Sequence, residues 1–372
     1  MAFKKTITMK HILEYKKKLN TCAELGWQEV KTTDYIASVL KDAPLKRGFR
    51  KGNTGLLYKV GTGSESILLR ADIDGLKTAQ GIKHTCGHST HMSALIGAYH
   101  YAKSIEKKIS QAGKSLYFLF QPAEESFPSG AQAFVNECGD IVKQIKQAFT
   151  IHVFPKLKLG EIGLQPAVVW ARGDYMEIRI KGKMVHIKDN LDGIDALYAA
   201  SLLIQKIKSI QKNHPSLRVG IGVIEGGRQA NTVADFALLK GDIRLKSESQ
   251  QPLIKSLLKR MCGEVEKKTG VQIELSYFDG YPTVNNDPLL TKKVTNDLKR
   301  QNTEYTLLDR GLFTYGCEDF AYISSIIPSV TAFIGTGDTY DLHEENCTIS
   351  DEGTLCAYNY FKFIIDRFSQ SQ

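Results

Sequence analysis

The chain has 372 residues, which is too long for one small domain and suits two. Hydrophobic residues make up 42% and charged residues 24%, so disorder, collagen and coiled coil are excluded as the main state. No apolar run approaches the roughly 18 residues of a membrane-spanning helix. The lysine-rich start also lacks the apolar segment of a signal peptide. We therefore expect a cytoplasmic protein that does not bind membranes.

The net charge is +9, from 49 Lys and Arg against 40 Asp and Glu. Because the basic residues are spread along the whole chain in short clusters, they favour a solvated surface over a nucleic-acid interface. The seven cysteines are odd in number and include no CxxC pair. This pattern argues against a disulfide framework and indicates a reducing compartment.

The first 170 residues alternate between strand-like and helix-like segments. Apolar runs predict strands at 56–60, 67–71, 116–120 and 149–153. Apolar residues at helical spacing predict helices at 12–19, 92–105 and 130–135. The alternation predicts an α/β domain whose mixed sheet has helices on both faces.

The pattern changes near Trp170. Segments typical of a strand, a helix, two strands, a helix and a strand follow at 176–180, 194–210, 217–223, 237–244, 253–265 and 271–277. This order is the ferredoxin-like α+β arrangement. After residue 281 the α/β pattern returns, with helices at 289–299 and 354–368 and a strand at 330–334. We predict a large domain, 1–170 and 282–372, with a small domain, 171–281, inserted into it.

Four of the nine histidines lie at positions 84, 88, 91 and 100, and the first three belong to the segment HTCGHSTH. Within it, Cys86 and His88 are two residues apart and follow a predicted strand. A thiolate and an imidazole at this spacing can face one centre, and both are ordinary zinc ligands. The alternative is a buried cysteine beside histidines that cap a helix.

Three more candidate ligand segments follow along the chain. Glu124 and Glu125 follow a predicted strand, His152 lies inside another, and His343 follows the loop at 335–337. Ligands of α/β sheets bind at the carboxyl ends of the strands. One carboxylate can bind a metal while its neighbour acts as general base. Each segment alone has a structural alternative, an acidic loop or a core histidine, but together they predict a metal centre.

The sequence resembles the aminoacylase-type metallopeptidase family, in particular its branch with hippurate hydrolase, N-acetyl-diaminopimelate deacetylase and plant indole-acetyl-amino-acid hydrolases. The resemblance extends from about residue 10 to 360. The motifs that carry it are RADIDG (70–75), HTCGHSTH (84–91), FQPAEE (120–125), HVFP (152–155), GGRQANTVAD (226–235), YGCEDF (315–320) and GTGDTYDLH (335–343).

The resemblance implies a metal-binding catalytic domain and a lid domain through which the chain forms a homodimer. It implies two divalent metal ions per chain, Zn²⁺ or alternatively Mn²⁺, Co²⁺ or Ni²⁺. Glu124 would be the general base, and Asp72 or Asp74 would orient a ligand. The implied metal ligands are Cys86, His88, Glu125, His152 and His343.

In the lid, the resemblance implies that His186 stabilises the oxyanion, where a preorganised donor contributes on the order of 3 kcal/mol. It places Asn231 and Arg244 near the carboxylate of the substrate, which the planar fork of an arginine binds well. The alternative for His186 and Arg244 is a surface position without a catalytic role.

The chain departs from the family pattern at a few positions. Ser89 stands where the family usually has Asp, Met184-Val185 replaces a glycine pair, and Ala234 stands where proline is common. The implied ligands and Glu124 are all retained. We expect a hydrolase of N-acyl amino acids with an acetyl or aromatic acyl group. The alternatives are a dipeptidase or carboxypeptidase of the same mechanism, and a catalytically silent relative that acts as a binding protein.

Overall fold

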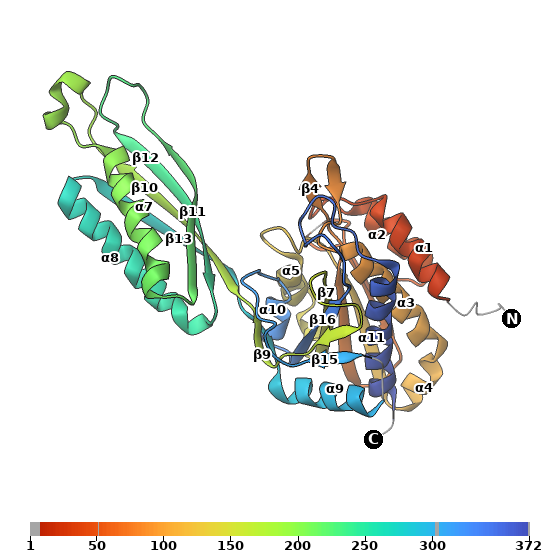
Figure 1. The fold of residues 1–372 in the computed structure, drawn as a ribbon. Coiled ribbons are helices and arrows are strands. Elements are labelled where there is room, and N and C mark those ends of the chain that lie inside the picture. The colour runs from red at the N-terminus through yellow and green to blue at the C-terminus, as the bar shows by residue number, and fades with distance from the viewer. Residues whose placement is uncertain (1–7, 51, 302–304, 371–372) are drawn as a thin grey trace. The chain divides into compact units, whose positions relative to one another are not determined.

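The computed structural model describes residues 8–50, 52–301 and 305–370. The chain divides into two compact units (Figure 1). The large unit contains residues 1–169, 285–312 and 319–372, and the small unit contains 170–284 and 313–318. In the described residues, no helix is both long and apolar enough to cross a membrane.

The large unit is built on a mixed sheet of eight strands in the order β1-β2-β6-β3-β7-β16-β8-β15. The four central strands, β6, β3, β7 and β16, run parallel to one another, so their carboxyl ends share one edge. In sheet order the strands are β1 (Lys46–Arg47), β2 (Leu56–Val60), β6 (Lys114–Gln121), β3 (Glu65–Asp72), β7 (Ile145–Phe154), β16 (Ser329–Gly335), β8 (Glu161–Gly163) and β15 (Thr306–Leu308).

Helices cover both faces of this sheet (Figure 1). On one face α3 (His88–Ser104) packs against α11 (Asp351–Ser369), and α1 (Met9–Asn20) packs on α3. On the other face lie α5 (Gly130–Glu137) and α10 (Ala321–Ser324). The remaining helices are α2 (Val30–Leu40), α4 (Glu106–Gln111), α6 (Gly139–Val142) and α9 (Pro288–Arg300). The predicted α/β class with a doubly covered mixed sheet is confirmed.

The small unit is an antiparallel sheet of four strands in the order β11-β12-β10-β13, with two helices on one face. This is the ferredoxin-like arrangement that the sequence predicts. Its elements are β10 (Arg172–Lys181), α7 (Ala196–Asn213), β11 (Leu217–Gly226), β12 (Phe236–Leu245), α8 (Gln251–Thr269) and β13 (Gln272–Tyr281). Short elements of the chain are η1 (Ile187–Asp192), η2 (Glu248–Gln250), β9 (Ala167–Trp170) and β14 (Val284–Asn286).

Two elements near the candidate residues are absent from the sequence-based prediction. Helix α2 carries Thr32, Thr33 and Ile36 on its buried side, and such β-branched residues have low helix propensity. The hairpin of β4 (Leu76–Thr78) and β5 (Gly81–Lys83) is only three residues long on each side. Packing of the buried side, rather than local propensity, therefore determines α2, and the hairpin is too short for a hydrophobic pattern to indicate it.

Candidate metal centre

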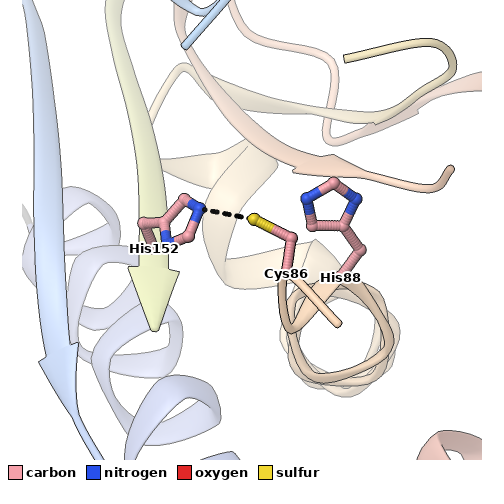
Figure 2. Close-up of side chains that lie close together, drawn as sticks. All are labelled: Cys86, His88 and His152. Carbon is pink, nitrogen blue, oxygen red and sulfur yellow. Dashed lines mark hydrogen bonds between the residues drawn. The ribbon is translucent and has the colours of Figure 1, made fainter. Parts of the chain in front are cut away.

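Cys86 and His88 lie at the amino end of α3 and His152 near the carboxyl end of β7 (Figure 2). Nε2 of His152 lies 3.6 Å from Sγ of Cys86. Between Cys86 and His88, Gly87 has φ +83°, and a Cβ on it would lie 2.3 Å from a methyl carbon of Val153. Glycine is therefore required here both for its left-handed backbone and for the close approach of α3 to β7.

The hydrogen bonds of these histidines determine which ring nitrogen carries the proton. Nδ1 of His152 donates to the carbonyl of Val153 at 2.8 Å, and Nδ1 of His88 donates to the carbonyl of Asp74 at 2.9 Å. Because a carbonyl only accepts, each Nδ1 carries a proton, and Nε2 is the ring nitrogen that can bind a cation. In the described part of the chain, Nε2 of His88 is buried and has no hydrogen-bond partner. A divalent cation bound to this nitrogen would satisfy it.

Glu125 and His343 complete the cluster from two further loops. Nε2 of His343 lies 3.2 Å from Sγ of Cys86 and 3.3 Å from a carboxylate oxygen of Glu125. The backbone N–H of Glu125 donates to the carboxylate of Asp74 at 2.9 Å. The side chain of His343 is 56% exposed, so this side of the cluster faces solvent.

The donor atoms form overlapping groups in which all atoms lie within 4.8 Å of one another. Cys86 belongs to two of these groups, one with His88 and His152 and one with Glu125 and His343. Glu124 forms a third group with His88 and Glu125, and it is 5% exposed. A soft thiolate, imidazole nitrogens and carboxylate oxygens suit Zn²⁺ and other first-row divalent ions.

His91 lies beside the cluster, but both of its nitrogens already have partners. Nδ1 donates to Asp72 at 2.7 Å, and Nε2 accepts the backbone N–H of Val153 at 3.0 Å. Behind it, the fully buried Arg70 pairs with Asp72 at 2.8 Å and with Asp319 at 2.7 Å. This network supports the β7 end that carries His152. The sequence-based prediction gives a supporting role to Asp72 but assigns none to His91, Arg70 or Asp319.

The electrostatic field of the site favours positive charge. Burial lowers the pKa of His88, but the carboxylates of Asp72, Asp74 and Glu125 outweigh it and raise that pKa to about 10. Burial raises the pKa of Asp72, yet His88, His91 and Arg70 hold it well below its usual value. The same buried carboxylates would stabilise a divalent cation beside His88.

The three candidate residues of the lid lie in the small unit. His186 is exposed at the start of η1, and the next residue, Ile187, donates its backbone N–H to the carbonyl of Asn231 at 2.9 Å. Asn231 precedes the start of β12, whereas Arg244 lies near the end of this strand, which spans roughly 30 Å. Its guanidinium makes two bonds to Asp242, at 2.6 and 2.9 Å. The structure brings His186 and Asn231 together, and it does not bring Arg244 to them.

Comparison with known proteins agrees with this architecture. A family model, Peptidase family M20/M25/M40, matches residues 68–366. N-acetyldiaminopimelate deacetylase of Listeria monocytogenes is 28% identical over 363 residues, which cover 92% of this chain and 95% of that protein. The enzyme of that name from Streptococcus pneumoniae is 29% identical over 367 residues, with the same coverage.

Among solved structures, a similar one is the YXEP protein of Bacillus subtilis, described as a dinuclear metal binding peptidase from the M20 family. The two chains superpose with a TM-score of 0.82 at 25% identity, covering 96% of this chain and 97% of that one. The match therefore includes both compact units.

Proposed function

Since the chain belongs to peptidase family M20/M25/M40 and is a hydrolase of amide bonds, we propose that it cleaves N-acyl amino acids into a carboxylic acid and a free amino acid. The observation that carries this proposal is the buried cluster of a thiolate, imidazoles and carboxylates, in which Nε2 of His88 lacks a partner among the described residues. The name of the Listeria relative, a deacetylase, supports an N-acetyl substrate, and an aromatic acyl group is the other candidate.

In this proposal the cluster holds two divalent metal ions, Zn²⁺, Mn²⁺, Co²⁺ or Ni²⁺. When bound, such ions supply Lewis acidity that lowers the pKa of a water molecule and polarises a carbonyl group. Cys86 is shared by two groups of donor atoms, one with His88 and His152 and one with Glu125 and His343, which is compatible with two neighbouring cations. The protein ligands would be Cys86, His88, Glu125, His152 and His343.

Glu124 is the proposed general base. One of its carboxylate oxygens lies 3.9 Å from Nε2 of His88, so it stands at the cluster. Because Glu124 is almost fully buried, its carboxylate is shielded from bulk water and can bind the proton of the attacking water molecule. It then transfers this proton to the nitrogen of the leaving amine. The proton taken from water is thus the one delivered to the amine, and no covalent intermediate forms.

In the small unit, we propose that His186 donates to the developing oxyanion and that Asn231 and Arg244 contact the substrate carboxylate. The exposure of His186 and its closeness to Asn231 support a site where both contact one substrate molecule. Arg244 already binds Asp242, so a substrate carboxylate would compete with that pairing. We also propose a homodimer through the small unit, because the outer edge of β11 exposes Val223 and Ile224. Cytoplasmic location remains a prediction from the sequence.

The second candidate is a dipeptidase or carboxypeptidase of the same mechanism, favoured by the description of the Bacillus structure as a peptidase. The test is elemental analysis of the purified chain, followed by hydrolysis of N-acetyl and N-benzoyl amino acids and free dipeptides with added Zn²⁺, Mn²⁺ or Co²⁺. We expect two metals and turnover of one acyl class. Turnover of dipeptides alone would replace the proposal with a peptidase. No metal and no turnover would indicate a silent binding protein.

A further inference from the structure

Glu29 is a fully buried carboxylic acid just before α2, and the proposed mechanism does not use it. Its Oε1 accepts the backbone N–H of Ala123 at 2.7 Å. Ala123 immediately precedes Glu124 and has φ +53°, a left-handed conformation that residues with a Cβ rarely adopt. The hydrogen bond thus holds the backbone at the point that sets the direction of the loop carrying Glu124 and Glu125.

The segment around Glu29 contacts the same loop at two further points. A Cβ on Gly26 would lie 2.2 Å from the hydroxyl oxygen of Ser126 and 3.2 Å from the backbone Cα of Ala123, so only glycine fits this close approach without a shift of the loop. The indole N–H of Trp27 donates to the carbonyl of Pro128 at 2.8 Å. The segment therefore contacts the loop on both sides of the pair of glutamates, at Ala123 before it and at Ser126 and Pro128 after it.

This segment also supports the loop that follows β3. The carbonyl of Glu24 accepts the backbone N–H of Gly75 at 2.7 Å. The neighbouring Asp74 accepts the N–H of Glu125 at 2.9 Å and the Nδ1–H of His88 through its carbonyl. The segment 24–29 therefore supports both loops from which site residues project.

We propose that Glu29 is a positioning residue for Glu124 and Glu125, because its carboxyl oxygen fixes the left-handed turn at Ala123 from which both side chains project. This inference rests on the proposed function, since it assigns Glu124 the role of base and Glu125 the role of ligand. Glu29 is itself assigned no contact with the substrate or the metal.

The chemistry of Glu29 indicates that it acts as a hydrogen-bond acceptor of fixed reach and not as a charge. Burial is the main cause that raises the pKa of Glu29 to about 8, and repulsion by Asp74 adds to it. The carboxyl is therefore protonated near pH 7. A neutral amide of the same length retains the acceptor oxygen. A shorter carboxylate keeps the acid but cannot reach Ala123 without moving the backbone.

The test compares Glu29→Gln, which retains the reach, with Glu29→Asp, which loses it. Glu266→Asp is the matched control, because Glu266 in α8 accepts the backbone N–H of Ile273 at the same 2.7 Å in the small unit. We expect Glu29→Asp to lower kcat at least tenfold while KM stays within threefold. Glu29→Gln should recover kcat to within threefold of the wild type. Glu266→Asp should lose thermal stability without losing kcat.

Two results would overturn the positioning role. One is a kcat of Glu29→Asp equal to or above that of Glu29→Gln, which would make the charge the functional property. The other is an equal loss of kcat in Glu266→Asp, which would indicate a general loss of stability. If Glu29→Asp does not fold, Glu29→Met keeps the length without an acceptor. The same loss of kcat is expected for it, and a wild-type kcat would overturn the role.

A second readout separates this inference from the proposed function. The dissociation constant for Zn²⁺, measured by dye competition, should rise at least threefold in Glu29→Asp, because Glu125 lies on the same loop. In Glu29→Gln the dissociation constant should rise less than in Glu29→Asp. If the wild type binds Zn²⁺ but hydrolyses no substrate, the proposed function fails, while this order of affinities still supports the positioning role. Equal Zn²⁺ affinity in both Glu29 variants and the wild type would overturn the positioning role.

Discussion

Nε2 of His343 lies 3.2 Å from Sγ of Cys86, although 257 positions separate the two residues in the sequence. The contact joins the loop after β16 to the residues just before α3. His343 itself has φ +68°, and its backbone N–H donates to the carbonyl of Thr85 at 2.9 Å. The loop that presents His343 is therefore held by the backbone beside Cys86, and one thiolate lies within reach of two groups of ligands.

Removal of the shared thiolate should therefore weaken both metal positions. We expect Cys86→Ala to lower the metal content measured by elemental analysis from about two ions to less than one, with loss of turnover. Cys262→Ala is the control, because that buried cysteine packs in the core of the small unit. Metal content equal to that of the wild type in Cys86→Ala would remove Cys86 from the ligand set.

Replacement of Glu124 separates proton transfer from metal binding. Glu124→Gln keeps the shape of the side chain but cannot take a proton from water. We expect unchanged metal content and a kcat lower by about 10²–10⁴-fold, the usual contribution of a general base. The measurement is steady-state kinetics of metal-loaded protein. A variant with full turnover would show that another group acts as the base.

The network behind His152 should affect metal affinity although it provides no ligand. His91→Ala removes the bridge between Asp72 and the backbone of Val153. Loss of such outer partners typically weakens metal binding by about 10–100-fold. We expect that range for Zn²⁺ by dye competition, together with a lower melting temperature. Affinity equal to that of the wild type would assign His91 to the core alone.

The lid histidine should affect turnover and leave the metals in place. His186→Ala should lower kcat by about 10²–10³-fold if the imidazole stabilises the oxyanion. Metal content should not change, because His186 belongs to the small unit and the cluster to the large one. Lys188→Ala, in the same exposed loop, is the control. Equal kcat in His186→Ala and Lys188→Ala would make His186 an ordinary surface residue.

Glu29 should also affect the pH dependence of stability. Its pKa is raised to about 8 in the folded chain, so the folded state retains this proton over a pH range in which the unfolded state has lost it. The stabilisation is fully present below the unfolded pKa of about 4.5 and is lost as the pH rises through about 8. In Glu29→Gln this contribution is absent.

Urea unfolding of the wild type and Glu29→Gln at pH 5 and pH 9 measures this contribution. The free energy of unfolding of the wild type relative to the variant should fall by a few kcal/mol between the two pH values. A difference between the two proteins that does not change with pH would show that Glu29 ionises normally in the folded chain.

The sequence predicts much of the fold because hydrophobic patterning is local. The apolar runs at 116–120 and 149–153 lie within β6 and β7. Glu124 and Glu125 follow β6 and His152 lies inside β7, as the sequence predicts. The supporting contacts are not local: Arg70 pairs with Asp319, 249 positions away, and His91 binds the backbone of Val153. A pattern within a short window cannot specify such pairs.

Helix α2 shows the same limit. Its sequence, VKTTDYIASVL, has an N-cap position at Glu29, but the Glu29 side chain makes no capping bond. It is directed instead to Ala123, 94 positions away. Only the fold brings these two segments together, so nothing in the local sequence distinguishes Glu29 from other glutamates near helix ends.

The most direct test of metal-dependent amide hydrolysis is the rate at which the purified chain hydrolyses N-acetyl and N-benzoyl amino acids before chelation, after chelation, and after Zn²⁺ or Mn²⁺ is restored. We expect turnover of one acyl class that disappears with the metals and returns with them. Turnover that persists without metal, or no turnover in the fully metal-loaded chain, would contradict the proposed function.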